Sequence, residues 1–434
     1  MKTGSRPPQK IPKTAKYDPY AAIRVGEFRV FLFGRVFMTL AYQMIDIIIY
    51  QQVYELTKNP LLIGFIGLAQ AIPIISIALY AGHIADRQNR RNIILVANIM
   101  VLFATIALVS ITYDLKGFIS SYGLISIYSL VFIIGAARGF LGPATFSLLG
   151  QVVNRELYAS AATWNSSVWQ TAAVMGPALG GLCYAKFSAA PSYGVACAFL
   201  FISITIMFLF IKPKPTPVPD TKESLRESIL SGIRFVFDSQ VILGALTLDL
   251  FAVLFGGVIA LLPFFANDIL HTNAIGLGLL KAATAFGSVI MAIILVYVPQ
   301  KKNAGRNLLW SVAGFGLCMI LFGLSHSFVL SLFLLVVSGM FDNVSVVIRT
   351  TTLQLKTPDN MRGRVAAVNS IFIGSSNEIG AVESGVAAKL MGIIPSVIFG
   401  GLMTLGVVGT TAWRAPKLRK LDLSEMKEEE KAVL

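Results

Sequence analysis

The chain has 434 residues, of which 55% are hydrophobic and only 13% are charged, and its formal net charge is +14. Soluble globular proteins carry about 25% charged residues, so this composition excludes an ordinary soluble protein. Apolar runs near 20 residues recur along the chain, and this is about the length at which a helix crosses a bilayer. Because the runs are apolar on all sides instead of alternating, they predict helices and not barrel strands.

The first 25 residues form a basic tail that prolines interrupt. This tail has no apolar core of the kind found in a signal peptide, so we do not expect it to be cleaved. Twelve apolar segments follow, with ends set only to within several residues: 28–53, 61–81, 92–112, 122–146, 162–185, 191–211, 241–265, 275–298, 307–325, 328–348, 366–388 and 393–412. The sequence therefore predicts an all-α integral membrane protein with twelve transmembrane helices.

Lysine and arginine are distributed unequally over the connecting loops. One side of the predicted membrane holds only Lys58, Lys116 and Lys186. The other side holds the remaining loop cations and both termini: Arg87, Arg90, Arg91, Arg155, Lys212, Lys214, Lys301, Lys302, Arg306, Lys356, Arg362 and Arg364. The positive-inside rule makes the basic side cytoplasmic, so both termini are expected there. The net charge is thus explained by topology, and no nucleic-acid partner is expected.

A change of composition divides the chain into two halves. Residues 212–239 begin with a Pro-rich stretch and continue with apolar residues at helical spacing, which predicts a cytoplasmic linker with an amphipathic helix on the membrane face. The predicted regions are a tail over 1–25, six-helix halves over 26–211 and 240–413, and a charged cytoplasmic tail over 414–434.

The halves contain a short internal repeat. Residues 161–181 align with 365–385, so that Asn165 and Ser166 coincide with Asn369 and Ser370, and the glycines at 176 and 181 with those at 380 and 385. Extending the alignment backward places Arg138 opposite Asp342. Two repeats related along the membrane normal, with substrate bound between them, form a common transporter plan. The alternative is a chance match between apolar segments.

Two motifs resemble those of the major facilitator superfamily. The stretch GHIADRQNRR contains Gly82, Asp86, Arg87, Arg90 and Arg91 and matches the family's loop pattern G-x-x-x-D-R-x-x-R-R. The stretch GPALGG contains Gly176, Pro177, Gly180 and Gly181 and matches the core of the helix-5 motif of proton-coupled exporters. Three departures are visible: Ala172 replaces a glycine, Leu141 replaces a glutamine between Arg138 and Gly142, and the second loop copy lacks its aspartate.

Longer stretches, such as QQVYELTKNPLLIGFIGLAQAIP and MRGRVAAVNSIFIGSSNEIG, resemble the enterobactin-exporter-like branch of this family. The resemblance implies a monomeric carrier that exports a small organic molecule, such as a siderophore or drug, in exchange for protons across the bacterial cytoplasmic membrane. It also implies that Asp86 and Arg90 contact the start of the segment at 366–388 and hold an outward-open state. The alternatives to an exporter are an importer of the same fold and a sensor that transports nothing.

Charges inside predicted spans are costly unless they are paired or hydrated. Asp46 lies in the middle of the first span, where it either carries a proton or is paired by a neighbouring helix. We expect Arg138 and Asp342 to face each other, either as a coupling pair or as a static one. Glu378 and Glu383 lie about 140° apart on one helix, and Lys281 is a candidate partner for one of them.

Other site chemistry is not expected. The three cysteines lie in apolar runs without motif spacing, the three histidines are scattered, and no nucleotide-binding or hydrolase motif is present. The sequence therefore predicts no metal, no cofactor and no enzymatic activity.

Overall fold

The computed structural model describes residues 20–113, 119–154, 157–214, 225–298, 300, 302–358 and 361–423. Regular structure within these ranges is helical. The first group of helices is α1 (Gly26–Thr57), α2 (Pro60–Arg87), α3 (Arg90–Tyr113), α4 (Ile119–Val152), α5 (Tyr158–Phe187) and α6 (Ala189–Phe210). The second group is α8 (Gln240–Gly256), η2 (Ile259–Leu261), α9 (Leu262–Phe264), η3 (Phe265–Ile269), α10 (Ala274–Tyr297), α11 (Ala304–Leu324), α12 (Phe328–Lys356), α13 (Arg362–Met391) and α14 (Ile393–Arg414). Two short helices complete the set, α7 (Leu225–Asp238) between the groups and α15 (Pro416–Arg419) after them.

Helices lie at every stretch predicted as a span. Ten helical stretches of the described residues are long and apolar enough to cross a membrane. Helices α5 and α13 are 30 residues long but are not among the ten. Both contain Ser, Asn and Glu or Gln side chains that lower their hydropathy, as expected of helices that pack inside a bundle. Many large apolar side chains elsewhere are exposed, including Phe103, Phe201, Trp310 and Phe333, as expected of surfaces in contact with lipid.

The segment predicted at 241–265 is interrupted. Helix α8 ends at Gly256, and Gly257 adopts an extended conformation before the chain resumes as the turns η2, α9 and η3. The interruption frees backbone groups that must still be satisfied within a membrane. The Ser384 hydroxyl of α13 donates a hydrogen bond of 2.8 Å to the Gly257 carbonyl. A neighbouring helix therefore stabilises the broken segment.

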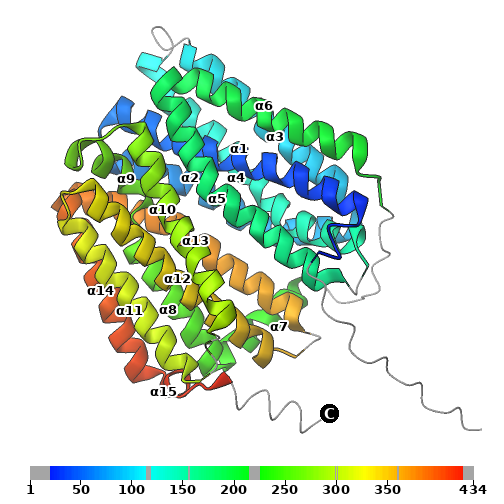
Figure 1. Cartoon of the computed structure of the whole chain (residues 1–434), viewed down its shortest axis with the longest axis vertical. Coiled ribbons are helices and arrows are strands. Elements are labelled where there is room, and N and C mark those ends of the chain that lie inside the picture. Colours follow the sequence, from blue (N-terminus) through cyan, green and yellow to red (C-terminus); the bar gives the residue numbers. More distant parts are fainter. Residues whose placement is uncertain are drawn as a thin grey trace, which may run out of the picture.

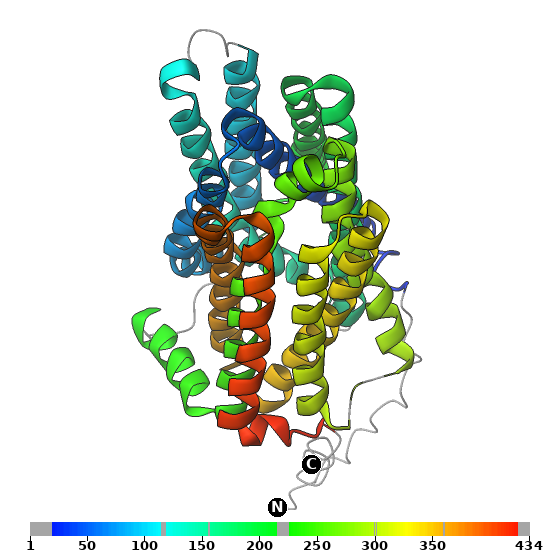
Figure 2. The same ribbon diagram turned by 90° about the vertical axis from the view of Figure 1, so that its left-hand side faces the viewer.

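The helices form two groups, α1–α6 and α8–α14, which lie one above the other in Figures 1 and 2. The groups contact each other mainly through α2 against α13 and through α5 against α10. We call the two ends of the molecule the Thr57 end, where α1 finishes, and the Gly26 end, where it begins. Backbones approach closely at the Thr57 end, where Gly64 contacts Gly385 and Gly181 contacts Ala274.

The apolar core shows the same asymmetry. One cluster of buried side chains runs through α1–α6 and continues into the Thr57 end of the second group, including Leu261, Phe265 and Phe322. Two separate clusters of described residues fill the Gly26 end of the second group, one around Leu248 and Leu308 and one around Leu246 and Val365. Among the described residues, the shared core therefore joins the groups at the Thr57 end.

Helix α7 packs against α13 and α8. Its Val236 is fully buried, whereas Phe237 is 57% exposed. The Arg364 side chain of α13 donates a hydrogen bond of 2.9 Å to the Ser231 hydroxyl. The side chains of Leu225 and Ile229, which belong to the predicted amphipathic face, lie outside the described residues.

Candidate functional site

An ion pair between α1 and α4 lies deep between the helices of the first group. The Arg138 guanidinium is 2.8 Å from the Asp46 carboxylate, and the two side chains are 21% and 15% exposed. The sequence shows that Asp46 has no partner on its own helix, and the structure supplies the partner from a helix 92 residues away. A charge inside a membrane is tolerated when it is paired in this way.

Polar neighbours hold the pair in place. Gln70 of α2 donates to Asp46 at 3.4 Å and accepts from Arg138 at the same distance. Arg138 also donates to the Tyr42 carbonyl at 3.3 Å, and its guanidinium lies 5.0 Å from the centre of the Tyr42 ring. Three helices therefore contribute to one hydrogen-bonded unit.

Two charges of the second group complete a cluster that spans the boundary between the groups. Lys281 of α10 and Glu378 of α13 both interact electrostatically with Asp46 and Arg138, and also with each other. The Lys281 ammonium lies 5.7 Å from the centre of the Tyr50 ring of α1. We call Asp46, Arg138, Lys281 and Glu378 the central charge cluster. It holds two cations and two carboxylates, so its formal charges cancel.

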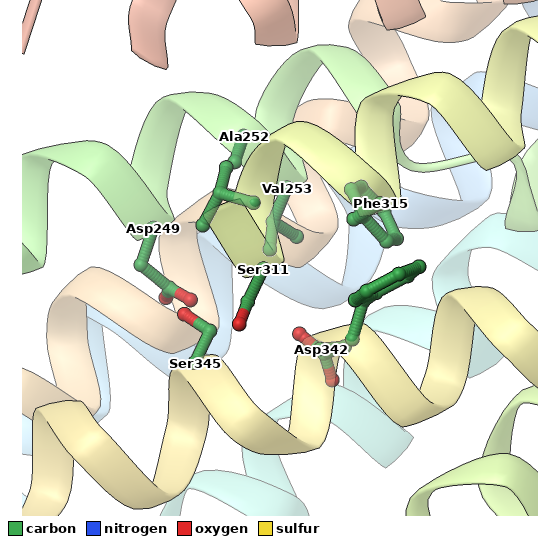
Figure 3. A pocket seen from close by; sticks show the side chains of 9 residues that line it. Asp249, Ala252, Val253, Ser311, Phe315, Asp342 and Ser345 are labelled. Carbon is green, nitrogen blue, oxygen red and sulfur yellow. The ribbon is translucent and has the colours of Figure 1, made fainter. Parts of the chain in front are cut away.

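The expected pairing of Arg138 with Asp342 differs from what the structure shows. Arg138 is bonded to Asp46, whereas Asp342 of α12 lines a small cavity inside the second group together with Asp249. Figure 3 shows these two carboxylates with Ser311 and Ser345 around the same space. Equivalent positions of a repeat lie at corresponding points of corresponding helices, but the neighbouring side chains differ between the two halves. Arg138 is therefore paired with the nearer carboxylate of Asp46 and not with Asp342.

Asp249 is paired as well, through a bond that the sequence did not indicate. It forms an ion pair with Arg349 of α12, and the two side chains are 8% and 3% exposed. The predicted span ends at residue 348, and Arg349 lies just beyond it. Helix α12 continues to Lys356. The run of apolar and threonine residues around Arg349 was the signal that the helix extends further.

Glu383 lies on α13 away from the central charge cluster, and it forms no ion pair among the described residues. Its neighbour Ser384 supports the break at Gly257. The other carboxylate of this helix, Glu378, belongs to the cluster. The structure therefore separates the two candidate glutamates, as their angular spacing on the helix predicts.

The helix-5 motif packs α5 on both sides. Added Cβ atoms at Gly176 and Gly180 would lie 2.4 Å from Gln43 and 2.5 Å from Ile47 of α1. An added Cβ at Gly181 would lie 2.2 Å from the Ala274 carbonyl oxygen of α10, and the Pro177 carbonyl approaches Gly278. The motif thus allows close contact of α5 with its own group and with the second group.

The loop motif is only partly described. The surroundings of Gly82 and the side chains of Asp86 and Arg87 at the end of α2 lie outside the described residues, and so does the side chain of Arg362 at the start of α13. Arg91 at the start of α3 donates hydrogen bonds of 3.2 Å and 2.5 Å to the Met207 and Phe208 carbonyls near the end of α6. A cation at a helix C-terminus is stabilised by the helix dipole. Arg90 is 6% exposed, and its Nε and Nη1 have no hydrogen-bond partner among the described residues.

A contact between the groups at the Thr57 end was not anticipated. The Tyr54 hydroxyl at the end of α1 donates a hydrogen bond to the Asp268 carboxylate of η3. Asn267 donates to Gln51 at 3.3 Å, and the rings of Tyr54 and Phe264 meet edge to face at 5.0 Å. Nothing in the local sequence relates residues 214 positions apart, so only helix packing reveals this contact.

No group of three or more His, Cys, Asp or Glu side chains within the described ranges is arranged to hold a metal ion. Cys183, Cys197 and Cys318 are free thiols.

Comparison with known proteins gives a consistent result. The profile of a family described as "Transmembrane secretion effector", within the major facilitator group, matches residues 17–433. The chain is 26% identical over 388 residues to "Enterobactin exporter EntS" of Shigella boydii serotype 4. This match covers 88% of this chain and 90% of that protein. The same values hold for EntS of Escherichia coli O1:K1.

Solved transporters share the fold. A bacterial homologue of the iron transporter ferroportin in an inward-facing state superposes with a TM-score of 0.70 at 15% identity, covering 91% of this chain and 99% of that one. A bacterial homologue of the human lysosomal transporter Spinster, in an inward-facing and unoccupied conformation, superposes with a TM-score of 0.69 at 13% identity. The match covers 92% of this chain and 97% of that one.

Proposed function

Because the chain belongs to the family of transmembrane secretion effectors, we propose that it exports a small organic molecule, such as a siderophore or drug, in exchange for protons. The protein is a membrane transporter of the major facilitator type, and its family is one of transporters and not of enzymes. It is a multi-pass protein of the bacterial inner membrane. Direction, substrate and coupling belong to the proposal.

The export direction is supported by the relatives. Proteins that match over 88% of this chain are named enterobactin exporters. At 26% identity the lining of a binding site changes readily, so the relatives support the class of substrate and not the individual compound. A siderophore or another organic molecule of similar size fits this class.

The central charge cluster is the observation that carries the proton coupling. Asp46 and Arg138 come from the first group, and Lys281 and Glu378 come from the second. Neutralising either carboxylate with a proton leaves one cation unbalanced and weakens the attraction across the boundary. A proton that binds one arrangement of the groups more tightly than another shifts the equilibrium between them. The cluster is therefore suited to link protonation to the movement of the halves.

The movement that we propose is a rocking of the halves 26–211 and 240–413 about this cluster, connected by the linker 212–239. In this proposal α5 and α13 complete a set of twelve spans, the Thr57 end faces outward and both termini are cytoplasmic. Hydrogen bonds and the shared apolar core join the halves at the Thr57 end. The described conformation is then closed to the outside.

Two alternatives remain in the proposal. An importer of the same fold would use the same cluster with the opposite direction of substrate flow. A non-transporting sensor would bind its ligand without moving protons. Substrate-stimulated proton flux in vesicles separates a carrier from a sensor, and the sign of substrate movement separates export from import.

The direct test compares export by cells with and without the protein. Cells that synthesise enterobactin and lack their own exporter are supplied with the wild type or with Asp46→Asn, and the siderophore in the medium is quantified. We expect the wild type to restore export and Asp46→Asn to lower the rate at least about tenfold, which corresponds to about 1.4 kcal/mol. Undiminished export by the variant would remove Asp46 from the mechanism. Export of a panel of drugs, measured in the same cells, tests the second substrate class.

A further inference from the structure

A small cavity lies inside the second group, lined by residues of α8, α11 and α12. Its volume of about 10 Å³ is room for one water-sized sphere. Its polar lining residues are Asp249, Ser311, Asp342 and Ser345, and its lining also includes Phe315 and Phe341. In Figure 3 the carboxylate and hydroxyl oxygens of these polar residues gather around a common space.

Ser345 supplies an independent sign that something binds there. Its side chain is 3% exposed, and its hydroxyl has no hydrogen-bond partner among the described residues. A buried hydroxyl without a partner costs free energy, so buried polar groups are nearly always satisfied. Ser311 is also buried, at 5% exposed, and donates its own proton to the Asn307 carbonyl at 2.7 Å. The lone pairs of the Ser311 oxygen are therefore available to accept a hydrogen bond or to coordinate a cation.

The charges around the cavity do not balance. Asp249 is compensated by its ion pair with Arg349. Asp342 has neither an ion pair nor a hydrogen bond to any side chain that the structure describes. The two carboxylates and one guanidinium sum to one negative charge. Asp342 is only partly exposed, and removing a charge from water without compensation is unfavourable, so the cavity favours one positive charge.

We propose that this cavity binds one alkali cation, Na⁺ or K⁺, through oxygens of Asp249, Ser311, Asp342 and Ser345. Carboxylate and hydroxyl oxygens are the donors that hard cations prefer. A single positive charge cancels the single negative charge, whereas a divalent ion would leave the site positive. The room for one water-sized sphere fits one ion. The site is distinct from the central charge cluster, which contains none of these residues.

The test is cation-dependent stability of the purified full chain in detergent. Its thermal midpoint is measured in NaCl, KCl and choline chloride at equal ionic strength. A ligand that binds only the folded state raises the midpoint with the logarithm of its concentration. We expect NaCl or KCl, but not choline chloride, to raise the midpoint, and the salt that acts at the lower concentration identifies the ion.

Variants connect the effect to the cavity. Asp342→Asn and Ser345→Ala are expected to abolish the rise. Ser338→Ala is a matched control on the same helix, because the Ser338 hydroxyl bonds to Leu335 outside the cavity. Asp238→Asn is the matching carboxylate control at an exposed position. Both controls are expected to respond as the wild type does.

Radioactive ²²Na⁺ binding to the same samples, with K⁺ as competitor, gives a readout that does not depend on unfolding. The proposal is overturned if the midpoint is the same in all three salts, or if Ser345→Ala and Asp342→Asn respond like the wild type. A midpoint that depends on pH alone and loses this dependence in Asp342→Asn would assign the charge to a proton and also overturn it. Because the readout is binding, the result does not depend on whether the protein exports a siderophore.

Discussion

At the scale of single residues, the partner of each buried charge decides its role. Asp46 could have been a lone carboxylate, but Arg138 lies 2.8 Å from it and Gln70 contacts both. Lys281 and Glu378 lie close enough to interact with this pair across the boundary between the halves. In the proposed function, this ion pair within one half, bordered by charges of the other, responds to the movement of the halves.

The first prediction concerns the Asp46–Arg138 pair. Asp46→Arg and Arg138→Asp are each expected to abolish transport, because each leaves two like charges together inside the membrane. The double variant restores an opposite pair and is expected to recover part of the transport rate. Export by cells measures all three. A double variant no better than the singles would show that the orientation of the pair, and not only its presence, is required.

The second prediction concerns the buried pair of Asp249 and Arg349. Removing one partner of a buried ion pair leaves an uncompensated charge and costs about 3–5 kcal/mol. Arg349→Met is therefore expected to lower the thermal midpoint strongly. The double variant Asp249→Leu with Arg349→Met replaces both charges by apolar side chains and is expected to recover most of the loss. Equal midpoints for the single and double variants would contradict this explanation.

At the scale of elements, small residues and breaks position the helices. Glycines let α5 approach both α1 and α10. After the break at Gly257 the chain continues through η2 and α9 into η3. Asn267 and Asp268 of η3 make the contact with α1. The sequence predicts the helix-5 motif, but not which helix each glycine meets.

The third prediction tests the contact of α5 with α10. Gly181→Ala places a Cβ 2.2 Å from the Ala274 carbonyl oxygen, so the helices must move apart. We expect a loss of about 1–3 kcal/mol of stability from overpacking, seen as a lower thermal midpoint, together with reduced export. Gly194→Ala on α6 is the control, since no atom lies within 4 Å of its added Cβ. A midpoint for Gly181→Ala equal to that of the control would contradict close packing at this site.

At the scale of the whole molecule, the two halves share their core and their polar contacts at the Thr57 end. The Gly26 end of the second half has apolar clusters of its own. Under the proposed alternating access, this asymmetry corresponds to a conformation that is closed at the Thr57 end.

The fourth prediction tests the contact between Tyr54 and Asp268. Tyr54→Phe removes the hydrogen bond but keeps the ring against Phe264, so the Thr57 end is expected to open more often. Spin labels at Leu56 and His271, in a background without native cysteines, report the separation of the halves. We expect longer distances to become more populated in Tyr54→Phe.

Tyr184→Phe serves as the control for this prediction. Tyr184 also donates to a carboxylate, at 2.6 Å from Glu55, but both residues belong to the first half. Its removal is expected to leave the distance distribution unchanged. An unchanged distribution in Tyr54→Phe would show that the apolar contacts alone hold this end closed.

The sequence by itself determined the helical membrane architecture, the family and the residues that carry intramembrane charge. These follow from composition, from the length of apolar runs and from local motifs, all of which are properties of short stretches. Only the tertiary structure decided which charges meet. Asp46 and Arg138 lie 92 positions apart, and the pairing expected from the repeat, Arg138 with Asp342, is replaced by two separate sites. Helical periodicity specifies the face on which a side chain lies, but the packing of other helices against that face selects its partner.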